Sequence, residues 1–489
     1  MGLPLRHSIG QVDTMHIEQF FLEGLGHQSY LVTDEATGVA AVVDPRRDIE
    51  IYLAAAERRG VHITHVFETH VHNDYVTGAL ELRDRIGATI VTAAAAEVSY
   101  EHLGVREGDS VTVGGMRFIV LETPGHTPNH ISFALYAPEA SAPHAVFSGG
   151  SLLTGNAGRT DLVSPGMTLT LTRDQYHSLR RLLDGMPEET VVYPTHGAGS
   201  FCGATTTTGT TRYSTIAQER QVSPAALAHD EAEFVRQQLE GYGLYPAYYA
   251  YMRDINMQGP SILHGMPEVP GLTPQQISAL LRNGIPLLDS RPRDVFAREH
   301  VPGAINIELD GSFGIYAGWL LPFNAPLSLL TEDDAGRREA VAQLIRIGFE
   351  QTRGYLDGGM AAWKEAGYPT GAYERINVDE LRRRVASAEA PAILDVRDET
   401  EWRAGHIPGA QHLHVADLPR HLNELPMDRP IAVICRTGHR ASIAASIVAA
   451  LGRDTIAVSE GVPDWMTRGY PVRLGAPEEG ATELEHAHP

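Results

Sequence analysis

The chain has 489 residues, of which 43% are hydrophobic and 20% charged, and its formal net charge is -22 at pH 7. This length exceeds what one hydrophobic core fills, so we expect roughly two to four folded domains. The negative charge repels nucleic acid and anionic membranes, and we expect neither as a partner. No apolar run is long enough to span a bilayer and no signal-peptide pattern is visible, which predicts a cytoplasmic protein.

Residues 1–255 are predicted to form one domain in which apolar strands alternate with helices. Several strands end in turns rich in His or Gly, which is typical of a layered α/β domain with its site at the strand ends. A helix is expected over Asp48–Arg59, and a Thr/Gly-rich surface loop that we predict to be flexible over 202–216. The expected strands include 28–34, 38–44, 64–70, 117–124 and 145–150.

Histidines follow several of these strands. FETHVHNDYVTG places His70, His72 and Asp74 at alternate positions, while His126 lies in ETPGHTPNH and His196 in YPTHGAG. Histidines at the ends of several strands, next to Gly, Pro or Thr, are what a metal site built on loops requires. The chain has 23 histidines, so any single one could be an ordinary surface or capping residue. The set as a whole predicts a metal site.

With GRTDL and HGAGSFCG, these motifs resemble the metallo-β-lactamase fold over residues 14–250, and especially its persulfide dioxygenase branch. The resemblance implies an αββα sandwich with a mononuclear Fe(II) centre, zinc being the alternative metal, which oxidises a thiol persulfide to sulfite with dioxygen. By motif, His70 and His126 match the histidine ligands. The remaining residues match positions that orient the ligands from behind: His72, Asp74 and His196.

The third ligand of that branch, an aspartate, is replaced here. FSGGSLL puts Gly150 at the aspartate position of the family pattern F-T-G-D-x-L. Two histidines alone would bind a divalent ion weakly, so a further group would have to complete the site. The sequence leaves the candidates open: Asp74, His130, Asp161, His196 or water.

The first motif also departs from that of the two-metal hydrolases, which have His where this chain has Tyr75. A thioester hydrolase of the glyoxalase II kind would lack a second-metal ligand there and its bridging carboxylate at Gly150, which argues against that function. Cys202 is either a substrate-handling thiol at the mouth of the site or part of the loop packing. Arg159 and Asp161 are predicted to form an internal ion pair.

The rest of the chain contains an internal repeat with a period of about 100 residues. LLDSRPRDVFAREHVPGAINI from Leu287 matches ILDVRDETEWRAGHIPGAQHL from Ile393, and GGMAAWKEAGYP matches EGVPDWMTRGYP. Strands alternate with helices in each copy, which predicts two small parallel-sheet α/β domains. The expected segments are a linker 256–272, domains 273–372 and 373–475, and an acidic, histidine-containing tail 476–489.

Cys435 lies in VICRTGHRAS, between an apolar strand and a helical apolar stripe. In such a strand-to-helix turn, free N–H groups and the helix dipole favour an anion. Arg436, His439 and Arg440 add positive charge, so we expect a lowered pKa of the Cys435 thiol and a thiolate nucleophile. The alternative is a small buried residue, which would not require these cations.

The second repeat resembles a rhodanese sulfurtransferase domain over residues 375–475, in all three stretches quoted. The resemblance implies that Cys435 accepts sulfane sulfur as a persulfide, with Arg436 and Arg440 as further catalytic groups. Four residues separate Cys435 from Arg440, whereas the related phosphatase loop has five, and the shorter loop suits a sulfur atom. The rest of the expected sulfur-binding loop is Thr437, Gly438 and His439.

The first repeat lacks this cysteine. Aligned through Gly336, it places Asp333 about where the cysteine stands, and a carboxylate cannot carry sulfur. We therefore predict a structural or docking domain. In the second repeat, Asp395 and Arg397 are expected to brace the loop. The first repeat keeps three residues of the shared pattern: Asp289, His300 and Trp363.

The two resemblances together predict an enzyme of sulfide and persulfide metabolism. Its N-terminal domain would oxidise a low-molecular-weight thiol persulfide, and Cys435 would move sulfane sulfur to or from thiosulfate or sulfite, with fusion raising the effective concentration of the shared intermediate. Gly150 supports an alternative, a sulfurtransferase whose N-terminal domain has lost its redox chemistry, and a non-enzymatic sulfur carrier is a third. The resemblance also implies a homo-oligomer, either a dimer or a tetramer.

Overall fold

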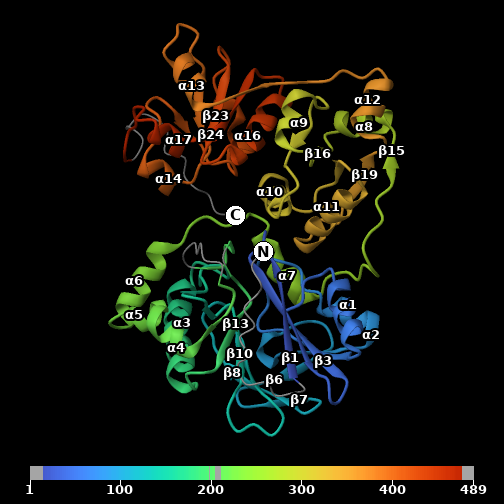
Figure 1. The fold of residues 1–489 in the computed structure, drawn as a ribbon, viewed down its shortest axis with the longest axis vertical. Coiled ribbons are helices and arrows are strands. Elements are labelled where there is room, and N and C mark those ends of the chain that lie inside the picture. The colour runs from blue at the N-terminus through green and yellow to red at the C-terminus, as the bar shows by residue number, and fades with distance from the viewer. Residues whose placement is uncertain (1–14, 198, 204–210, 476–489) are drawn as a thin grey trace, which may run out of the picture. The chain divides into compact units, whose positions relative to one another are not determined.

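The structure is a computed structural model that describes residues 15–197, 199–203 and 211–475 (Figure 1). The chain divides into two compact units, Met1–Met266 with Ile345–Gly348 and Pro267–Leu344 with Phe349–Pro489. The predicted tail 476–489 and residues 204–210 of the Thr/Gly-rich loop lie outside the described residues. Among the described helices, none has the length and apolar character needed to span a bilayer.

Unit 1 contains two six-stranded sheets. The first consists, in spatial order, of β1 (Met15–Leu22), β2 (His27–Asp34), β3 (Val39–Val43), β4 (His62–Phe67), β5 (Thr89–Ala93) and β6 (Leu103–Val105). The strands β1 to β3 are antiparallel, and β3 to β6 are parallel. The second consists of β14 (Ser214–Thr215), β13 (Val191–Pro194), β10 (Ala145–Gly149), β9 (Ile131–Tyr136), β8 (Met116–Glu122) and β7 (Ser110–Val113). Only β10 and β13 pair in parallel there.

Strand β2 of the first sheet is buried on both faces, as the alternation of its side chains shows. Tyr30 and Val32 belong to the core shared with the second sheet, whereas Leu31 belongs to the core under the helices. Successive strand residues point to opposite faces, so one strand supplies both cores. The ring of Phe67 stacks on that of Phe118 with centroids 4.3 Å apart, which ties the two sheets together.

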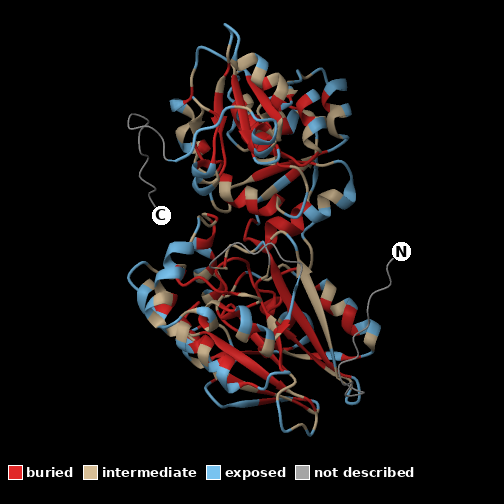
Figure 2. Cartoon of the chain, turned by 60° about the vertical axis from the view of Figure 1, so that its left-hand side comes forward, coloured by how far each residue is buried: buried red, intermediate tan, exposed pale blue. Residues whose placement is uncertain are grey.

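Helices cover the outer faces of both sheets (Figures 1 and 2). The first sheet packs against α1 (Glu50–Arg59) and α2 (Ala79–Ile86), and the second against α3 (Thr168–Gly185), α4 (Ile216–Val222), α5 (Pro224–Leu227) and α6 (Glu231–Gly241). The αββα sandwich and the expected strands are therefore confirmed. Helix α7 (Tyr249–Gln258) crosses the boundary predicted at residue 255. A short hairpin joins β11 (Leu152–Leu153) to β12 (Asn156–Ala157).

Unit 2 contains two five-stranded parallel sheets with the same strand order, which confirms the repeat. The first consists of β15 (Gly271–Leu272), β19 (Thr352–Leu356), β18 (Leu327–Leu330), β16 (Leu287–Asp289) and β17 (Ile305–Asn306). The second consists of β20 (Glu374–Ile376), β24 (Thr455–Gly461), β23 (Ile431–Cys435), β21 (Ala392–Asp395) and β22 (Gln411–His412).

Helices connect the parallel strands in both repeats. The first has α8 (Pro274–Arg282), α9 (Arg293–Arg298), α10 (Phe313–Leu320), α11 (Asp334–Arg346) and α12 (Gly359–Glu365). The second has α13 (Val378–Val385), α14 (Glu399–Ala404), α15 (Leu418–His421), α16 (His439–Ala450) and α17 (Val462–Thr467). Parallel strands need such crossover connections, and here a helix supplies most of them.

Buried contacts recur at matching places in the two repeats. The indole Nε1 of Trp363 donates to the carbonyl oxygen of Pro369 at 2.8 Å, and Trp465 does the same to Pro471 at 2.8 Å. Both tryptophans lie in the cores of their domains. The closing GYP stretch of each repeat is therefore held by the same hydrogen bond.

An aspartate–arginine pair ends the corresponding strand of each repeat. Nη2 of Arg291 lies 2.5 Å from Oδ2 of Asp289, and Nη2 of Arg397 lies 2.6 Å from Oδ2 of Asp395. Arg397 also donates to the carbonyl oxygen of Gly405 at 2.8 Å. Asp395 therefore forms a buried ion pair with Arg397 that fixes the strand end, and bracing of the cysteine loop by this pair stays a prediction.

The sheet register corrects the alignment of the two loops. The paired aspartates of the repeats lie opposite Leu330 in one sheet and Ile434 in the other. The next residues are Thr331 and Cys435, so Thr331 stands at the cysteine position, and the alignment of Asp333 with the cysteine was wrong. A threonine carries no thiol, so the first repeat still lacks the nucleophile.

In the first repeat, Asp333 instead accepts a hydrogen bond at the start of a helix. Its Oδ1 accepts a hydrogen bond from the backbone N–H of Gly336 at 2.7 Å, which satisfies a free donor at the start of α11. Three residues separate Leu330 from Asp334, whereas four separate Ile434 from His439. Gly336 lies inside α11, whereas Gly438 precedes α16, so aligning the two glycines displaced the cysteine position by two residues.

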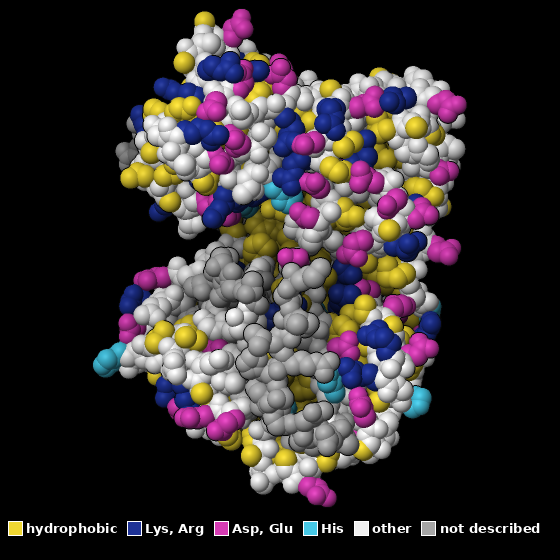
Figure 3. All heavy atoms as spheres, viewed as in Figure 1, with side chains coloured by type: hydrophobic (Ala, Val, Ile, Leu, Met, Phe, Trp, Pro, Cys, Tyr) yellow, Lys and Arg dark blue, Asp and Glu magenta, His cyan; other side chains and the backbone are white. Residues whose placement is uncertain are grey.

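Acidic and basic side chains are interspersed on the face drawn in Figure 3. Within unit 1, for example, Nε of Arg59 lies 3.1 Å from Oε2 of Glu18. Over the described residues of that face, no broad field of one sign develops, although the chain carries a net charge of -22.

Candidate functional site

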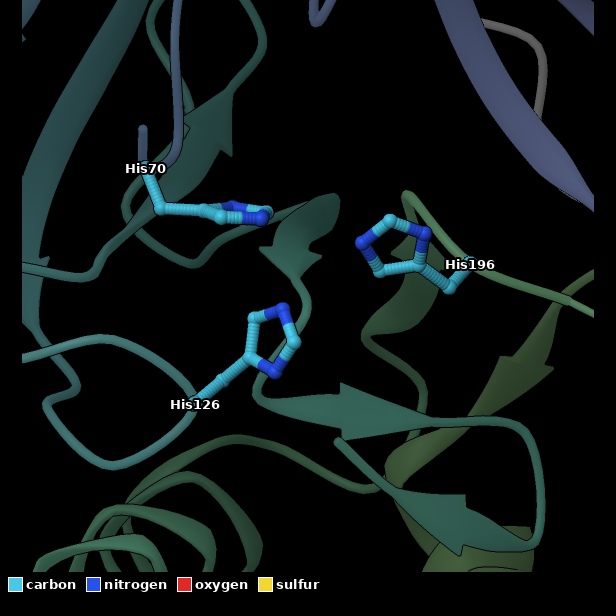
Figure 4. A group of neighbouring side chains, drawn as sticks. All are labelled: His70, His126 and His196. Atoms are coloured by element: carbon cyan, nitrogen blue, oxygen red, sulfur yellow. The ribbon is translucent and has the colours of Figure 1, made fainter. Parts of the chain in front are cut away.

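Three histidines meet where strands of unit 1 end. His70 follows β4, His126 lies between β8 and β9, and His196 follows β13. All three are buried, and one ring nitrogen of each lies within 4.8 Å of the other two. Figure 4 shows the three rings turned toward a common space. This is a candidate metal centre made from three separate loops.

A hydrogen bond at Nδ1 fixes the ring of His70, and another fixes the ring of His126. The Thr69 hydroxyl donates to Asp44 at 2.8 Å, so it accepts from Nδ1–H of His70 at 2.9 Å. Nδ1–H of His126 donates to the carbonyl oxygen of Arg159 at 2.7 Å. Nε2 of each ring then carries the lone pair, as in histidines that ligate metals.

Nε2 of His70, His126 and His196 is buried without a hydrogen-bond partner among the described residues. Burial lowers the pKa of His70 and His196 well below the usual value and that of His126 to about 4. The imidazoles are therefore neutral at neutral pH, as metal ligands must be. Three buried, unsatisfied nitrogen donors fit a divalent metal such as iron or zinc.

His72 lies beside this centre, with its Nε2 close to two carboxylates. Its Nε2 lies 3.0 Å from Oε2 of Glu68 and 3.3 Å from Oδ1 of Asp44. Burial alone would lower the pKa of His72, but the two carboxylates outweigh burial and raise it to about 10. In this structure His72 is therefore a partner of two buried carboxylates.

Asp44 connects two of the histidine loops. Its carboxylate accepts from the backbone N–H of Thr69 at 2.8 Å and from the hydroxyls of Thr69 and Thr195. Those threonines immediately precede His70 and His196. The sequence analysis missed Asp44 and Glu68, although both end apolar strands, which was the signal available.

Two of the groups left open by the sequence are already engaged. His130 contacts the Thr123 hydroxyl through Nδ1 at 2.9 Å and accepts the backbone N–H of Gly150 through Nε2 at 2.9 Å. Asp161 binds Arg159 through both oxygens at 2.7 Å, which confirms the predicted internal pair. Neither has an atom left to aim at the histidine centre.

Asp74 and Cys202 lie behind His196. Oδ2 of Asp74 is 3.4 Å from Nδ1 of His196, and burial raises the pKa of Asp74 to about 6. Sγ of Cys202 lies 3.9 Å from the hydroxyl of Tyr249, and burial raises the thiol pKa well above its usual value. A buried, protonated thiol favours packing over a substrate-handling role for Cys202.

Cys435 ends β23 and is 1% exposed. Helix α16 begins at His439, so its N-terminus and the preceding backbone N–H groups adjoin the loop. Gly438 has φ 81°, and a Cβ atom there would lie 2.5 Å from the carbonyl oxygen of Ser459. Only glycine permits this left-handed turn so close to neighbouring backbone.

The positive charge expected around the thiol is smaller than the sequence suggested. Nη1 of Arg440 lies 3.1 Å from Asp398, and Nη2 lies 2.7 Å from Glu401. Burial lowers the pKa of His439, which makes it neutral at neutral pH. Arg436 is exposed. Carboxylates at the start of α14 therefore offset Arg440, because the folded chain brings that helix against the loop.

The cysteine-free repeat also reaches this loop, which the sequence analysis did not foresee. The ring of Tyr316 on α10 lies 5.2 Å from that of His439, and Trp319 lies 4.9 Å from His414. Nε2 of His414 is 3.0 Å from Asp398, the partner of Arg440. The aromatic segment FGIYAGWL was the available signal, since it has no counterpart in the second repeat.

Two family models match the chain. The Metallo-beta-lactamase superfamily matches residues 22–196, and the Rhodanese-like domain matches 273–366 and 377–468. A curated hydroxyacylglutathione hydrolase from Rhodospirillum rubrum is 37% identical over 169 residues, 34% of this chain and 60% of that protein. Another from Rhizobium johnstonii is 34% identical, and the chain again spans 60% of its length.

Solved structures resemble the chain over longer ranges. A metallo-beta-lactamase from Staphylococcus aureus has 28% sequence identity and a TM-score of 0.63, covering 70% of this chain and 99% of its own. The ETHE1 protein from Myxococcus xanthus has 32% identity and a TM-score of 0.43, covering 50% of this chain and 98% of its own.

Proposed function

Because the chain belongs to the metallo-beta-lactamase superfamily and carries two rhodanese-like domains, we propose that it is an enzyme of persulfide metabolism with two reaction centres. The histidine centre oxidises a low-molecular-weight thiol persulfide to sulfite, and Cys435 transfers sulfane sulfur. The observation that carries the proposal is the centre of three neutral histidines with unsatisfied Nε2 atoms, joined in one chain to a cysteine at a helix N-terminus.

The oxidation converts a persulfide, dioxygen and water into a thiol, sulfite and two protons. The outer sulfur loses four electrons and dioxygen gains four, so the reaction is balanced without another reductant. Iron bound at the histidines would supply this redox chemistry. The protein holds the rings of His70 and His126 through Thr69 and Arg159, and Asp44 anchors the loop of His196 through Thr195. All three imidazoles are buried away from bulk water.

The transfer takes place at Cys435. Its thiolate attacks the outer sulfur of thiosulfate, the S–S bond of thiosulfate breaks, and sulfite leaves with the bonding pair. In reverse, sulfite takes the sulfur from the Cys435 persulfide and gives thiosulfate. The N-terminus of α16 stabilises the anionic sulfur in both directions. Sulfite therefore links the two centres, and the free thiols of Cys202 and Cys435 suit a reducing cytoplasm.

The curated relatives make thioester hydrolysis the second candidate. They are hydroxyacylglutathione hydrolases, and we expect that activity to need a two-metal site. In this chain the Tyr75 hydroxyl donates to the carbonyl oxygen of Asp44 at 3.2 Å, and Gly150 brings no bridging carboxylate. We therefore favour oxidation, and S-lactoylglutathione is the substrate that would reveal the hydrolase.

The deciding experiment uses full-length Cys435→Ser protein loaded anaerobically with Fe(II) and supplied with glutathione persulfide. We expect oxygen uptake with one sulfite formed per dioxygen consumed, because the substitution leaves the histidine centre intact. No uptake by protein with bound iron would reject the dioxygenase. It would leave a sulfurtransferase with an inactive N-terminal domain, which thiocyanate formation from thiosulfate and cyanide by the unsubstituted protein would identify.

A further inference from the structure

The space beside Gly150 is filled by the ring of His126. A Cβ atom at position 150 would lie 2.2 Å from Cδ2 and 2.7 Å from Nε2 of His126. These separations are far below van der Waals contact, so no other residue fits at 150 while His126 keeps its place. A carboxylate from this position is therefore incompatible with the ring as the structure has it.

The His126 ring is held where it is. Its Nδ1 donates to the carbonyl oxygen of Arg159 at 2.7 Å, and its backbone N–H donates to Oε1 of Gln175 at 2.7 Å. A Cβ atom on Gly158 would lie 2.8 Å from Nδ1, so a second glycine borders the ring. The ring cannot swing aside for a side chain at 150 without losing these contacts.

An imidazole nitrogen of His196 can supply the third ligand in place of the missing carboxylate. His196 brings an imidazole nitrogen within 4.8 Å of ligand atoms of both His70 and His126. Asp74 belongs instead to a group with His72 and His196, and Nε2 of His72 lies 3.0 Å from Oε2 of Glu68 and 3.3 Å from Oδ1 of Asp44. His196 is thus the group that completes a set with the two predicted ligands.

We propose that the metal is held by the imidazoles of His70, His126 and His196, and that Gly150 is a requirement of this all-histidine centre rather than a lost ligand. The position that supplies an aspartate in the related enzymes is closed here by His126. Metal binding by the three imidazoles can be tested apart from the oxidation.

The test measures Fe(II) affinity of the full-length protein by anaerobic competition with a chelator, and counts imidazole ligands by X-ray absorption of the Fe(II) protein. We expect three imidazoles per metal in the unsubstituted chain and two in His196→Gln, with affinity lowered at least about 100-fold. Asp74→Asn is the matched control, since Asp74 touches only the far side of the His196 ring. It should lower affinity about 10-fold at most and keep three imidazoles.

Substitutions at position 150 distinguish a structural requirement for glycine from the simple loss of a carboxylate ligand. If Gly150 were only a lost carboxylate, Gly150→Asp would tighten Fe(II) binding. We expect Gly150→Asp and Gly150→Ala both to weaken it, because the Cβ atom itself displaces His126. Circular dichroism checks that each variant is folded, and His196→Gln decides the matter if the position 150 variants do not fold.

Three results would overturn the proposal. They are unsubstituted protein that binds no divalent metal, His196→Gln protein that keeps its affinity and three imidazoles, and Gly150→Asp protein that binds iron more tightly. Iron bound through three imidazoles without sulfite formation would leave this inference standing and reject the proposed oxidation.

Discussion

The two rhodanese-like repeats of unit 2 share a scaffold and differ where chemistry would take place. Trp363 and Trp465 make the same hydrogen bond to the closing proline segment, and each sheet ends its corresponding strand in an Asp–Arg pair. Cys435 in one copy is replaced by Thr331 in the other. The contacts that hold the fold are therefore separate from the residues that would carry sulfur, so one can be lost without the other.

The loops themselves differ more than their sheets. Cys435 is buried and is followed by Arg436 and a left-handed glycine. Thr331 is followed by exposed acidic residues: Glu332, Asp333 and Asp334. An acidic helix start repels anions such as thiosulfate, so the first loop has lost its electrostatic complement as well as its thiol. Four experiments test this division between scaffold and chemistry.

The largest effect is expected at the cysteine. Cys435→Ser should lower thiocyanate formation from thiosulfate and cyanide by at least about 1000-fold, because a hydroxyl does not accept sulfane sulfur. Thr331→Ser, at the matching position of the other repeat, should leave the rate unchanged. Substantial transfer by Cys435→Ser protein would place the sulfur on another residue.

The scaffold pairs should respond alike in both repeats. Asp395→Asn and Asp289→Asn each leave a buried arginine without its carboxylate, which costs about 3 kcal/mol. Urea unfolding followed by tryptophan fluorescence should show a lower midpoint for unit 2 in both variants. A large loss in one repeat and none in the other would mean that the two scaffolds are not equivalent.

The first repeat should influence the cysteine loop through α10. Tyr316→Leu removes a ring 5.2 Å from that of His439 and should raise KM for thiosulfate about fivefold, with a smaller change in kcat. Phe323→Leu is the control, because Phe323 packs against Phe349 rather than the loop. Equal effects of the two substitutions would contradict a local role of Tyr316.

The smallest effect is expected when a thiol is returned to the first repeat. Thr331→Cys in the Cys435→Ser background should show no thiocyanate formation above that of Cys435→Ser alone. The loop is one residue shorter there, and its acidic helix start disfavours a thiolate. Recovery of activity would show that the thiol alone, and not the loop, distinguishes the repeats.

Most of the fold could be predicted from local pattern. The apolar runs at 28–34, 64–70 and 145–150 are strands, and the internal repeat gave two domains of equal topology. The loop alignment failed because it matched Gly336 with Gly438. Gly336 lies inside α11, whereas Gly438 precedes α16, so this match displaced the cysteine position by two residues, and only the pairing of neighbouring strands reveals the shift.

The candidate metal site could be predicted in part. Motif spacing located the three histidine loops, but His72 turns to Asp44, 28 residues earlier in the chain. Because β3 and β4 are parallel with Val43 opposite Phe67, the next residues, Asp44 and Glu68, reach the same sheet edge. That strand pairing is a property of the tertiary structure, and motif spacing alone does not predict it.

The neutral charge of three imidazole ligands affects which molecules bind at the histidine centre. A carboxylate ligand would cancel one positive charge of a divalent ion, whereas neutral imidazoles cancel none. The centre of unit 1 would therefore act as an anion receptor that prefers an ionised persulfide over its neutral acid. Sulfite, which carries up to two negative charges, would be retained more strongly still. A second reaction that consumes sulfite would then relieve product inhibition of the first.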